Sequence, residues 1–137
     1  MRVSTKGRYA LRVMIDIAQH QEDGCVSLKG IAERQDVSVK YLEAIVSILN
    51  KAGLVVSYRG KEGGYKLSRA PEKYTINEIL TLTEGSLAPV VCLENAEGNQ
   101  CERAYGCITL PMWKKLDEVI NDYLGNITLK DLIEGNV

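Results

Sequence analysis

Three of the four cysteines in this 137-residue chain lie close together in the sequence. Cys92, Cys101 and Cys107 have the spacing C-x8-C-x5-C in "CLENAEGNQCERAYGC", a segment with few apolar residues to pack. Thiolates are soft ligands that suit zinc, Cu(I) and iron–sulfur clusters. The segment has no CxxC pair, which is usual in structural zinc sites. Wide, irregular spacing in an acidic, glycine-containing loop favours a cluster near the surface, and the alternative is three free thiols.

The composition predicts a cytoplasmic protein. No run approaches the roughly 18 apolar residues of a membrane span, and "MRVSTKGRYALRVMIDIAQHQ" resembles an amphipathic helix rather than a signal peptide. Thiols stay reduced in that compartment, so metal binding or redox sensing is expected in place of a structural disulfide. Cys25 stands apart and is expected to be a half-buried apolar residue at a turn. His20 is expected at the end of the first helix, as a surface or C-capping residue.

Charge is divided unevenly along the chain. Residues 1–70 contain 12 Lys and Arg against 7 Asp and Glu, residues 71–137 contain 5 against 11, and the whole chain carries a formal charge of −1. A basic first half suggests a polyanion-binding unit joined to something else. The sequence contains no Ser-His-Asp set, metalloprotease helix motif or Gly-rich phosphate loop, so we expect no enzymatic activity.

The first half has the pattern of a helix-turn-helix. Apolar residues recur at helical spacing over 4–21, with Ser4 as a possible N-cap. Ser27 precedes a short helix, "LKGIAERQ", which ends at the turn "DVS", and Ser38, the last residue of that turn, precedes a longer helix, "VKYLEAIVSILNKAG". A short helix, a tight turn and a longer helix in this order predict a helix-turn-helix.

The periodicity changes after the second of these helices. "LVVSY" and "GYKLS" are short β-rich runs around "RGKEGG", which predicts a hairpin, the wing of a winged helix. "TINE", from Thr75 to Glu78, predicts a capping box that opens a helix ending near Gly85. Pro111 lies in the first turn of a long helix, "MWKKLDEVINDYLG". Its apolar residues form a seam that needs a partner: Trp113, Leu116, Ile120 and Tyr123.

The start of the second helix of a helix-turn-helix can reach base edges in the major groove of DNA. The candidate contacts are Ser38, Lys40, Tyr41 and Glu43 in this helix and Arg59 and Lys61 in the wing. Hydroxyl and ammonium groups could bind phosphate, and Glu43 could accept a hydrogen bond from cytosine N4. The alternative is an ordinary helix pair with a solvated charged face. A helix-turn-helix with a wing on a basic half favours DNA binding.

The chain as a whole resembles the Rrf-two family of bacterial winged-helix regulators, and most closely its IscR branch, to which the NsrR and CymR groups are related. The matching stretches are "MRVSTKGRYALRVMIDIA", "YLEAIVSILNKAGLV", "RGKEGGYKLSR", the three cysteines, "CITLPMW" and "NITLKDLI". The resemblance implies a homodimer in which the helix at 112–124 crosses its partner. It also implies an iron–sulfur cluster held by Cys92, Cys101 and Cys107. The DNA contacts of the family correspond to Ser38, Tyr41, Glu43 and Arg59.

The chain departs from the family at the fourth cluster ligand. IscR proteins usually supply a histidine three residues after the last cysteine, where this chain has Leu110. NsrR-type proteins use a carboxylate from the first helix of the other chain, where this chain has Arg8. The remaining candidates are Glu94, Glu97, Glu102, a residue of the partner chain, or an exogenous thiol or water. Three cysteines fit either a 2Fe–2S cluster, which is favoured, or a 4Fe–4S cluster.

The sequence therefore predicts a mainly α fold with a small β-hairpin. We expect a winged helix-turn-helix domain at 1–85, a cysteine-containing cluster-binding loop at 86–110, and a dimerisation helix with a short C-terminal helix at 111–137. The expected function is that of a homodimeric repressor whose binding to a pseudo-palindromic operator in double-stranded DNA is modulated by a redox-sensing iron–sulfur cluster. Neither a membrane nor a small-molecule substrate is expected as a partner. Two alternatives stay open: a winged-helix regulator that senses thiol oxidation or zinc, and a CymR-like sulfur-metabolism regulator that acts through a partner protein.

Overall fold

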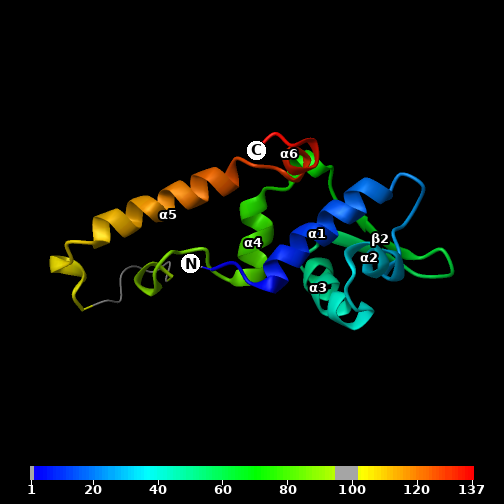
Figure 1. The fold of residues 1–137 in the computed structure, drawn as a ribbon, viewed down its shortest axis with the longest axis horizontal. Coiled ribbons are helices and arrows are strands. Elements are labelled where there is room, and N and C mark those ends of the chain that lie inside the picture. The colour runs from blue at the N-terminus through cyan, green and yellow to red at the C-terminus, as the bar shows by residue number, and fades with distance from the viewer. Residues whose placement is uncertain (1, 95–101) are drawn as a thin grey trace.

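The computed structural model describes residues 2–94 and 102–137, and its elements follow the predicted order (Figure 1). The chain begins with three helices, α1 (Thr5–His20), α2 (Leu28–Gln35) and α3 (Val39–Lys51). A hairpin of β1 (Val55–Tyr58) and β2 (Gly64–Leu67), the 3-10 turn η1 (Pro71–Lys73) and α4 (Ile76–Glu84) follow. The turns η2 (Val91–Leu93) and η3 (Ala104–Gly106) belong to the cysteine segment, and α5 (Leu110–Gly125) and α6 (Leu129–Glu134) complete the fold. The fold is thus mainly helical with a two-stranded antiparallel hairpin, as predicted.

Serine side chains begin the first three helices, as the sequence indicates. Each hydroxyl accepts a hydrogen bond from the backbone N–H three residues further along the chain. The pairs are Ser4 with Gly7 at 3.1 Å, Ser27 with Gly30 at 3.0 Å and Ser38 with Tyr41 at 3.1 Å. A cap of this kind contributes about 1 kcal/mol to stability. The helix starts are therefore encoded locally.

The capping box predicted at the start of α4 forms only in part. Thr75 accepts a hydrogen bond from the N–H of Glu78 at 3.1 Å, but the Glu78 carboxylate accepts two hydrogen bonds from Arg69 at 2.8 and 2.9 Å. A guanidinium fork is a stronger partner for a carboxylate than a neutral backbone N–H. A complete capping box instead opens α6, where Thr128 and Asp131 exchange hydrogen bonds at 2.9 and 3.1 Å.

The main core forms where α1 packs against α3, α4 and the hairpin. Its buried apolar residues on α1 and α3 are Ala10, Val13, Met14, Ile17, Leu42, Ile45, Val46 and Leu49. The apolar residues of α3 that recur at helical spacing are all buried, whereas on α1 the flanking residues Leu11 and Ala18 are only partly buried. Burial of one large apolar side chain stabilises the fold by about 1.5–3 kcal/mol. This core holds the helix-turn-helix in one orientation.

The wing is joined to the segment that precedes α2. The strands β1 and β2 pair antiparallel from Val55 opposite Leu67 to Tyr58 opposite Gly64. Val26 and the β2 residue Tyr65 add a further bridge, with hydrogen bonds of 2.9 and 2.8 Å. A Cβ on Gly64 would collide with the backbone of Val26, so glycine permits this close approach.

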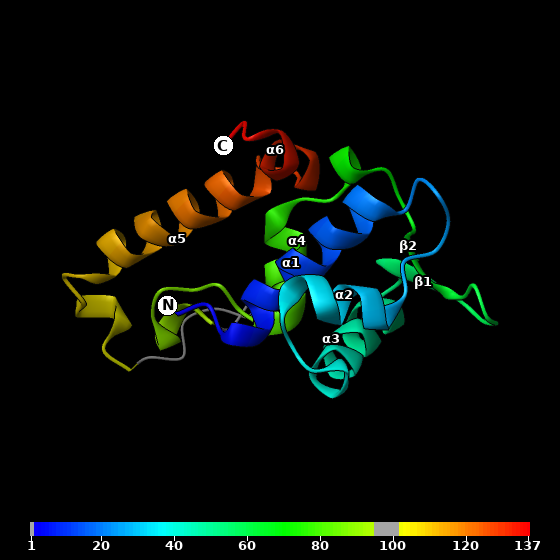
Figure 2. The ribbon, with the colours of Figure 1, turned by 45° about the vertical axis from the view of Figure 1, so that its right-hand side comes forward.

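The helix α5 extends away from the winged-helix unit (Figures 1 and 2). Its C-terminal half contacts α4, where Asn77 donates a hydrogen bond to Asn121 at 2.9 Å, and Ile120 packs against a second, smaller apolar cluster. The chain then returns, and Leu129 of α6 is fully buried in the main core. Among the described residues, no helix combines the length and apolarity that a membrane crossing requires.

The apolar seam predicted on α5 is divided between two faces. Trp113 and Ile120 are half-buried, and Ile120 lies on the side of α4. The other face is exposed, with an apolar stripe formed by Met112 (54% exposed), Leu116 (40%), Val119 (51%) and Tyr123 (57%). The spacing of this α5 stripe, 4, 3 and 4 residues, follows one side of a helix.

Candidate nucleic-acid interface and cysteine segment

The turn between α2 and α3 has the geometry of a helix-turn-helix. The helix α2 ends at Gln35, and Asp36 adopts the left-handed conformation with φ 54° and ψ 51°. Asp36 is the only described residue other than glycine with a positive φ. Its N–H donates a hydrogen bond to the carbonyl of Ala32, and Ser38 begins α3. Three residues therefore separate the two helices, as the predicted turn requires.

The first turn and a half of α3 presents the predicted contact residues to solvent. Ser38, Lys40 and Glu43 are exposed. The hydroxyl oxygen of Ser38 caps the helix, which leaves its O–H able to donate. Tyr41 is half-buried, and its ring lies edge-on to that of Tyr9, with centroids 5.8 Å apart at 89°. Four predicted residues thus share one end of the helix, and one of them also packs against α1.

The wing tip carries the other two predicted residues. Arg59 and Lys61 are both exposed, and Figure 1 shows the hairpin extending beyond the body of the fold near α2. Within the described part of the chain, neither these two cations nor Lys40 and Glu43 form an ion pair. All four charged groups are therefore available to a ligand.

An ion pair between a buried carboxylate and a partly exposed arginine joins the helix-turn-helix to α1. Asp16 is 2% exposed, and its carboxylate accepts hydrogen bonds from Nε and Nη2 of Arg34 at 3.0 and 2.6 Å. The hydrogen bond to Asp16 raises the pKa of the Arg34 guanidinium above its usual value. A buried carboxylate requires such a partner because removal from water is costly. This pair sets the position of α2 on α1.

Tyr74 fixes the base of the wing. Its side chain is fully buried, and its O–H donates to the carbonyl of Leu54 at 2.6 Å. The same oxygen accepts hydrogen bonds from the N–H groups of Ser68 and Arg69, both at 3.0 Å. The Arg69 guanidinium lies 4.8 Å from the centroid of the Tyr74 ring, and its hydrogen bond to Glu78 raises its pKa. Both strands of the wing are thereby tied to one buried side chain.

Two of the three clustered cysteines lie in the described part of the chain. Cys92 lies in η2 and Cys107 precedes α5, and both are partly buried; Cys101 falls outside the described residues. The Sγ of Cys107 lies 3.4 Å from the hydroxyl of Thr109, which lowers the pKa of the thiol, with help from the N–H groups of Thr109 and Leu110. A thiol that ionises readily is a suitable ligand for a soft metal. Over the described ranges, no three His, Cys, Asp or Glu side chains gather into a metal site.

The two positions at which the family resemblance implies a fourth ligand contain an apolar residue and an arginine here. Leu110 is apolar and 8% exposed at the start of α5. Arg8 is exposed, and its guanidinium donates to the Thr5 hydroxyl at 3.4 Å. Of the acidic candidates, Glu94 and Glu102 are exposed, and Glu97 falls outside the described residues.

Cys25 and His20 occupy the positions expected of them. Cys25 is partly buried before the bridge residue Val26. The ring of His20 is 44% exposed in the last turn of α1, with Nδ1 2.8 Å from the carbonyl oxygen of Asp16. Neither residue lies in the cysteine cluster of the sequence.

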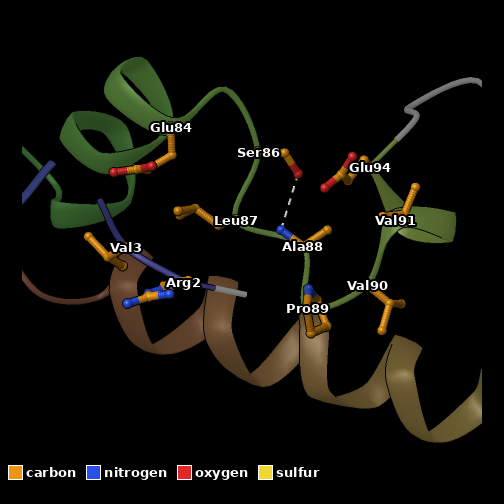
Figure 3. Close-up of a pocket in the computed structure, with 10 residues that line it drawn as sticks. All are labelled: Arg2, Val3, Glu84, Ser86, Leu87, Ala88, Pro89, Val90, Val91 and Glu94. Carbon is orange, nitrogen blue, oxygen red and sulfur yellow. Dashed lines mark hydrogen bonds between the residues drawn. The ribbon is translucent and has the colours of Figure 1, made fainter. Parts of the chain in front are cut away.

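A cavity of about 390 Å³ lies beside the cysteine segment, and the sequence did not predict it. Arg2 and Val3 line one side, and the stretch from Glu84 to Glu94 lines the rest (Figure 3). One Glu84 oxygen accepts hydrogen bonds from the N–H and O–H of Ser4 at 2.9 and 2.6 Å. The walls come from parts of the chain that are 80 residues apart, so no local pattern could indicate the cavity.

A helix-turn-helix followed by a two-stranded wing defines the class of winged-helix DNA-binding proteins. The chain belongs to the Rrf2 family: the family model, described as an iron-dependent transcriptional regulator, matches residues 3–135. It is a transcriptional regulator of the Rrf2 and IscR type, and its family and relatives are regulators rather than enzymes. The predicted family membership is therefore confirmed.

Relatives and solved structures agree over nearly the whole chain. The regulator IscR of Erwinia tasmaniensis is 41% identical over 133 residues, which is 97% of this chain and 79% of the relative. IscR of Yersinia pseudotuberculosis has the same identity and coverage. The structure of CymR, the global cysteine regulator of B. subtilis, has a TM-score of 0.81 with 38% identity, covering 98% of this chain and 97% of that one. The structure of T. potens IscR has a TM-score of 0.77 with 39% identity, covering 100% and 89%.

Proposed function

We propose that this protein is a homodimeric repressor whose affinity for a pseudo-palindromic operator depends on an iron–sulfur cluster. The observation that carries the proposal is the set of exposed polar side chains at the start of α3 and at the wing tip, none of which forms an ion pair with another described residue. Both belong to one winged-helix unit that a common core holds together. The family and the relatives support a role in transcription.

The start of α3 enters the major groove in this proposal. Ser38 and Tyr41 donate from hydroxyls, and Lys40 from its ammonium, to backbone phosphates. Glu43 accepts a hydrogen bond from the amino group of cytosine N4. Its carboxylate needs such a donor, because a charge removed from water without a partner is unfavourable. Arg59 and Lys61 enter the flanking groove from the wing tip. Phosphate contacts supply affinity, and the contact from Glu43 supplies base preference.

The α5 stripe pairs two copies of the chain. Its four apolar residues form one face, and each is 40–57% exposed. A second copy that covers this stripe would remove apolar surface from water, which stabilises a dimer. Two winged-helix units related by a two-fold axis would meet half-sites about 34–36 Å apart.

Cys92, Cys101 and Cys107 would hold the cluster, with the fourth ligand open among the candidates given above. When bound, an iron–sulfur cluster supplies a redox- and iron-dependent chemical signal. The thiolate of Cys107, favoured by Thr109, is prepared for ligation. Ligation of one cluster by all three cysteines would restrain the segment that carries them. A typical coupling of about 1–3 kcal/mol between two sites would change operator affinity about 5- to 150-fold.

The first experiment is the absorption spectrum of protein purified without oxygen, together with its iron and sulfide content. Visible bands with matching iron and sulfide support the cluster, and the variants Cys92→Ala, Cys101→Ala and Cys107→Ala should each lose it. Cys25→Ala is the matched control and should keep the cluster. A colourless protein that contains no iron would overturn this part of the proposal.

DNA binding is tested by selecting duplexes from a random pool with the wild-type protein. An enriched sequence with two-fold symmetry supports the proposed operator, and its affinity should fall steeply with salt because phosphate contacts release counterions. Equal affinity of cluster-bound and cluster-free protein for that duplex would sink the sensing role. The absence of any enriched sequence would sink DNA recognition itself.

Thiol oxidation is a second candidate signal, and two observations favour it. The pKa of Cys107 is lowered, and Leu110 stands where IscR proteins usually have a ligand. CymR of Staphylococcus aureus in an oxidized form is also a structural neighbour, with a TM-score of 0.74, 38% identity and coverage of 98% of this chain and 97% of that one. Under this proposal, cluster-free protein should change its operator affinity when its thiols are oxidised and recover it on reduction. Zinc binding would show as zinc in the purified protein. Control by a partner protein would show as DNA binding that requires that partner.

A further inference from the structure

Asp16 is the only buried charged residue among those that the structure describes. Besides Arg34, its carboxylate accepts a hydrogen bond from Nε2 of Gln35 at 3.0 Å. Gln35 is the last residue of α2, immediately before the helix-turn-helix turn. The buried carboxylate is therefore linked directly to the residue at which the turn begins.

The chemistry of its neighbours permits only one orientation of the Gln35 amide. A carboxylate accepts hydrogen bonds and an arginine only donates them. Nε2 of Gln35 donates to Asp16, and Oε1 accepts from Nε of Arg12 at 2.8 Å. A flipped amide would place two acceptors against each other and two donors against each other. Asp16 and Arg12 thus lock Gln35 from opposite sides.

Arg12 contacts the structure on both sides of the turn. Its Nη2 lies 3.3 Å from the backbone carbonyl of Gln35, one of the carbonyls at a helix end that has no partner within the helix. Its guanidinium lies 4.5 Å from the centroid of the Tyr9 ring. Tyr9 in turn meets Tyr41 edge-on, in the first turn of α3. Arg12 therefore contacts Gln35, before the turn, directly. It is linked to Tyr41, after the turn, through the ring of Tyr9.

We infer that Arg12 is a positioning residue that fixes the start of α3 relative to α1 and thereby sets sequence discrimination by the protein. It acts through Gln35 and Tyr9, and not by binding DNA itself. Part of this inference rests on the proposed DNA-binding function. The positioning of the turn does not, and it can be measured without DNA.

Arg12→Lys tests the positioning. Lysine keeps the charge, but it lacks the planar guanidinium that donates twice to Gln35 and stacks on the ring of Tyr9. Arg8→Lys is the matched control, one helical turn earlier, where the guanidinium donates to the Thr5 hydroxyl at 3.4 Å. Amide hydrogen exchange in the absence of DNA should accelerate about fivefold at Val37, Tyr41 and Leu42 in Arg12→Lys, the factor expected for one net hydrogen bond. The melting temperature should fall by only about 3–4 °C, because the change removes one exposed hydrogen bond and leaves the core intact. Unchanged exchange at these amides would overturn the inference.

The DNA arm uses the duplex selected by the wild-type protein and a scrambled duplex of equal length. Arg12→Lys should weaken binding to the selected duplex about fivefold and leave binding to the scrambled duplex unchanged, whereas Arg8→Lys should change neither. Arg12→Gln separates positioning from contact. A direct phosphate contact would lower the slope of log affinity against log salt by about 0.9, and positioning leaves the slope unchanged.

The failures of the two ideas are distinguishable. If no duplex is selected, the proposed function fails, and the exchange experiment still decides whether Arg12 positions the turn. If a duplex is selected and Arg12→Lys binds it as tightly as the wild type, the inference about discrimination is wrong. A reduced salt slope in Arg12→Gln would show that Arg12 is a phosphate contact instead.

Discussion

The carboxylate of Asp16 lies 2.6 Å from Nη2 of Arg34, and the two residues differ sharply in burial. The Asp16 side chain is 1% exposed, whereas the Arg34 side chain is 37% exposed. The pair joins the first helix to the helix-turn-helix, so the position of α3 depends on it. Because of this difference in burial, removal of Arg34 and removal of Asp16 should lower the free energy of unfolding by different amounts.

Arg34→Ala should therefore destabilise the protein more than Asp16→Ala. Loss of the arginine leaves a buried carboxylate with no permanent cation, since only the His20 ring, at 3.7 Å, and the Gln35 amide remain beside it, at a cost of about 3 kcal/mol or more in the free energy of unfolding. Loss of the aspartate leaves a guanidinium that water can still reach, and we expect about 2 kcal/mol. Urea unfolding measures both values, with the exposed Asp23→Ala as control. Equal costs for the two variants would contradict this account.

Gly7 should resist substitution because α4 ends against it. A Cβ at this position would collide with the Glu84 carboxylate, which two hydrogen bonds hold on Ser4. Gly7→Ala would gain about 1 kcal/mol of helix propensity and lose about 2 kcal/mol of hydrogen bonding, a net destabilisation near 1 kcal/mol. In a Glu84→Ala background the same change should stabilise the protein by about 1 kcal/mol. Thermal unfolding of the four proteins in this cycle gives the sign in each background.

Tyr74→Phe should loosen the base of the wing. The change leaves the carbonyl of Leu54 and the N–H groups of Ser68 and Arg69 without their shared partner. We expect a loss of about 2 kcal/mol from the free energy of unfolding. Tyr58→Phe, on the 49% exposed side chain of β1, is the control and should change stability by less than about 0.5 kcal/mol. A Tyr74→Phe protein as stable as the control would refute the role of this hydroxyl.

Val119→Glu should dissociate the proposed dimer. Val119 lies within the α5 stripe and is 51% exposed in the single chain, so a carboxylate there costs little in the monomer. In a dimer it would place two like charges in an apolar contact, which is strongly unfavourable. Sedimentation at micromolar concentration should show a monomer with an unchanged helical spectrum. Glu118→Gln, on the neighbouring position outside the stripe, should remain a dimer.

Glu43→Ala and Arg59→Ala should affect DNA binding in different ways. Glu43 is proposed to read a base, so its removal should relax base preference at one position of each half-site by about 1–3 kcal/mol. Arg59 is proposed to lie in the flanking groove, so its removal should weaken binding to all sequences and reduce the salt slope. Selection from a random pool with each variant separates the two effects. Unchanged preference in Glu43→Ala would remove this residue from the readout.

Much of the winged-helix unit could be predicted from the sequence because its signals are local. The caps at Ser4, Ser27 and Ser38 depend on a side chain and a backbone N–H three residues away. The buried face of α3 follows from helical spacing alone, and the wing follows from short β-rich runs around glycines. These features need no information from distant parts of the chain.

The exceptions all involve a competing partner from elsewhere in the chain. The Glu78 side chain does not complete the predicted capping box, because its carboxylate accepts two hydrogen bonds from the guanidinium of Arg69, nine residues away. The seam on α5 was split because α4 covers Ile120 and leaves Leu116 and Tyr123 exposed. In each case the spacing predicted which residues were suitable, and packing decided which of them were used.

The sequence by itself therefore determined the elements, the family and the residue types available for DNA and metal binding. Only the tertiary structure decided that Asp16 is buried against Arg34 and that Gln35 lies between Asp16 and Arg12. Only the tertiary structure, too, formed a pocket between Val3 and Glu84 beside the cysteine segment. The reason is physical: caps and periodicity act over a few residues, whereas burial and charge pairing depend on which distant segments the core brings into contact.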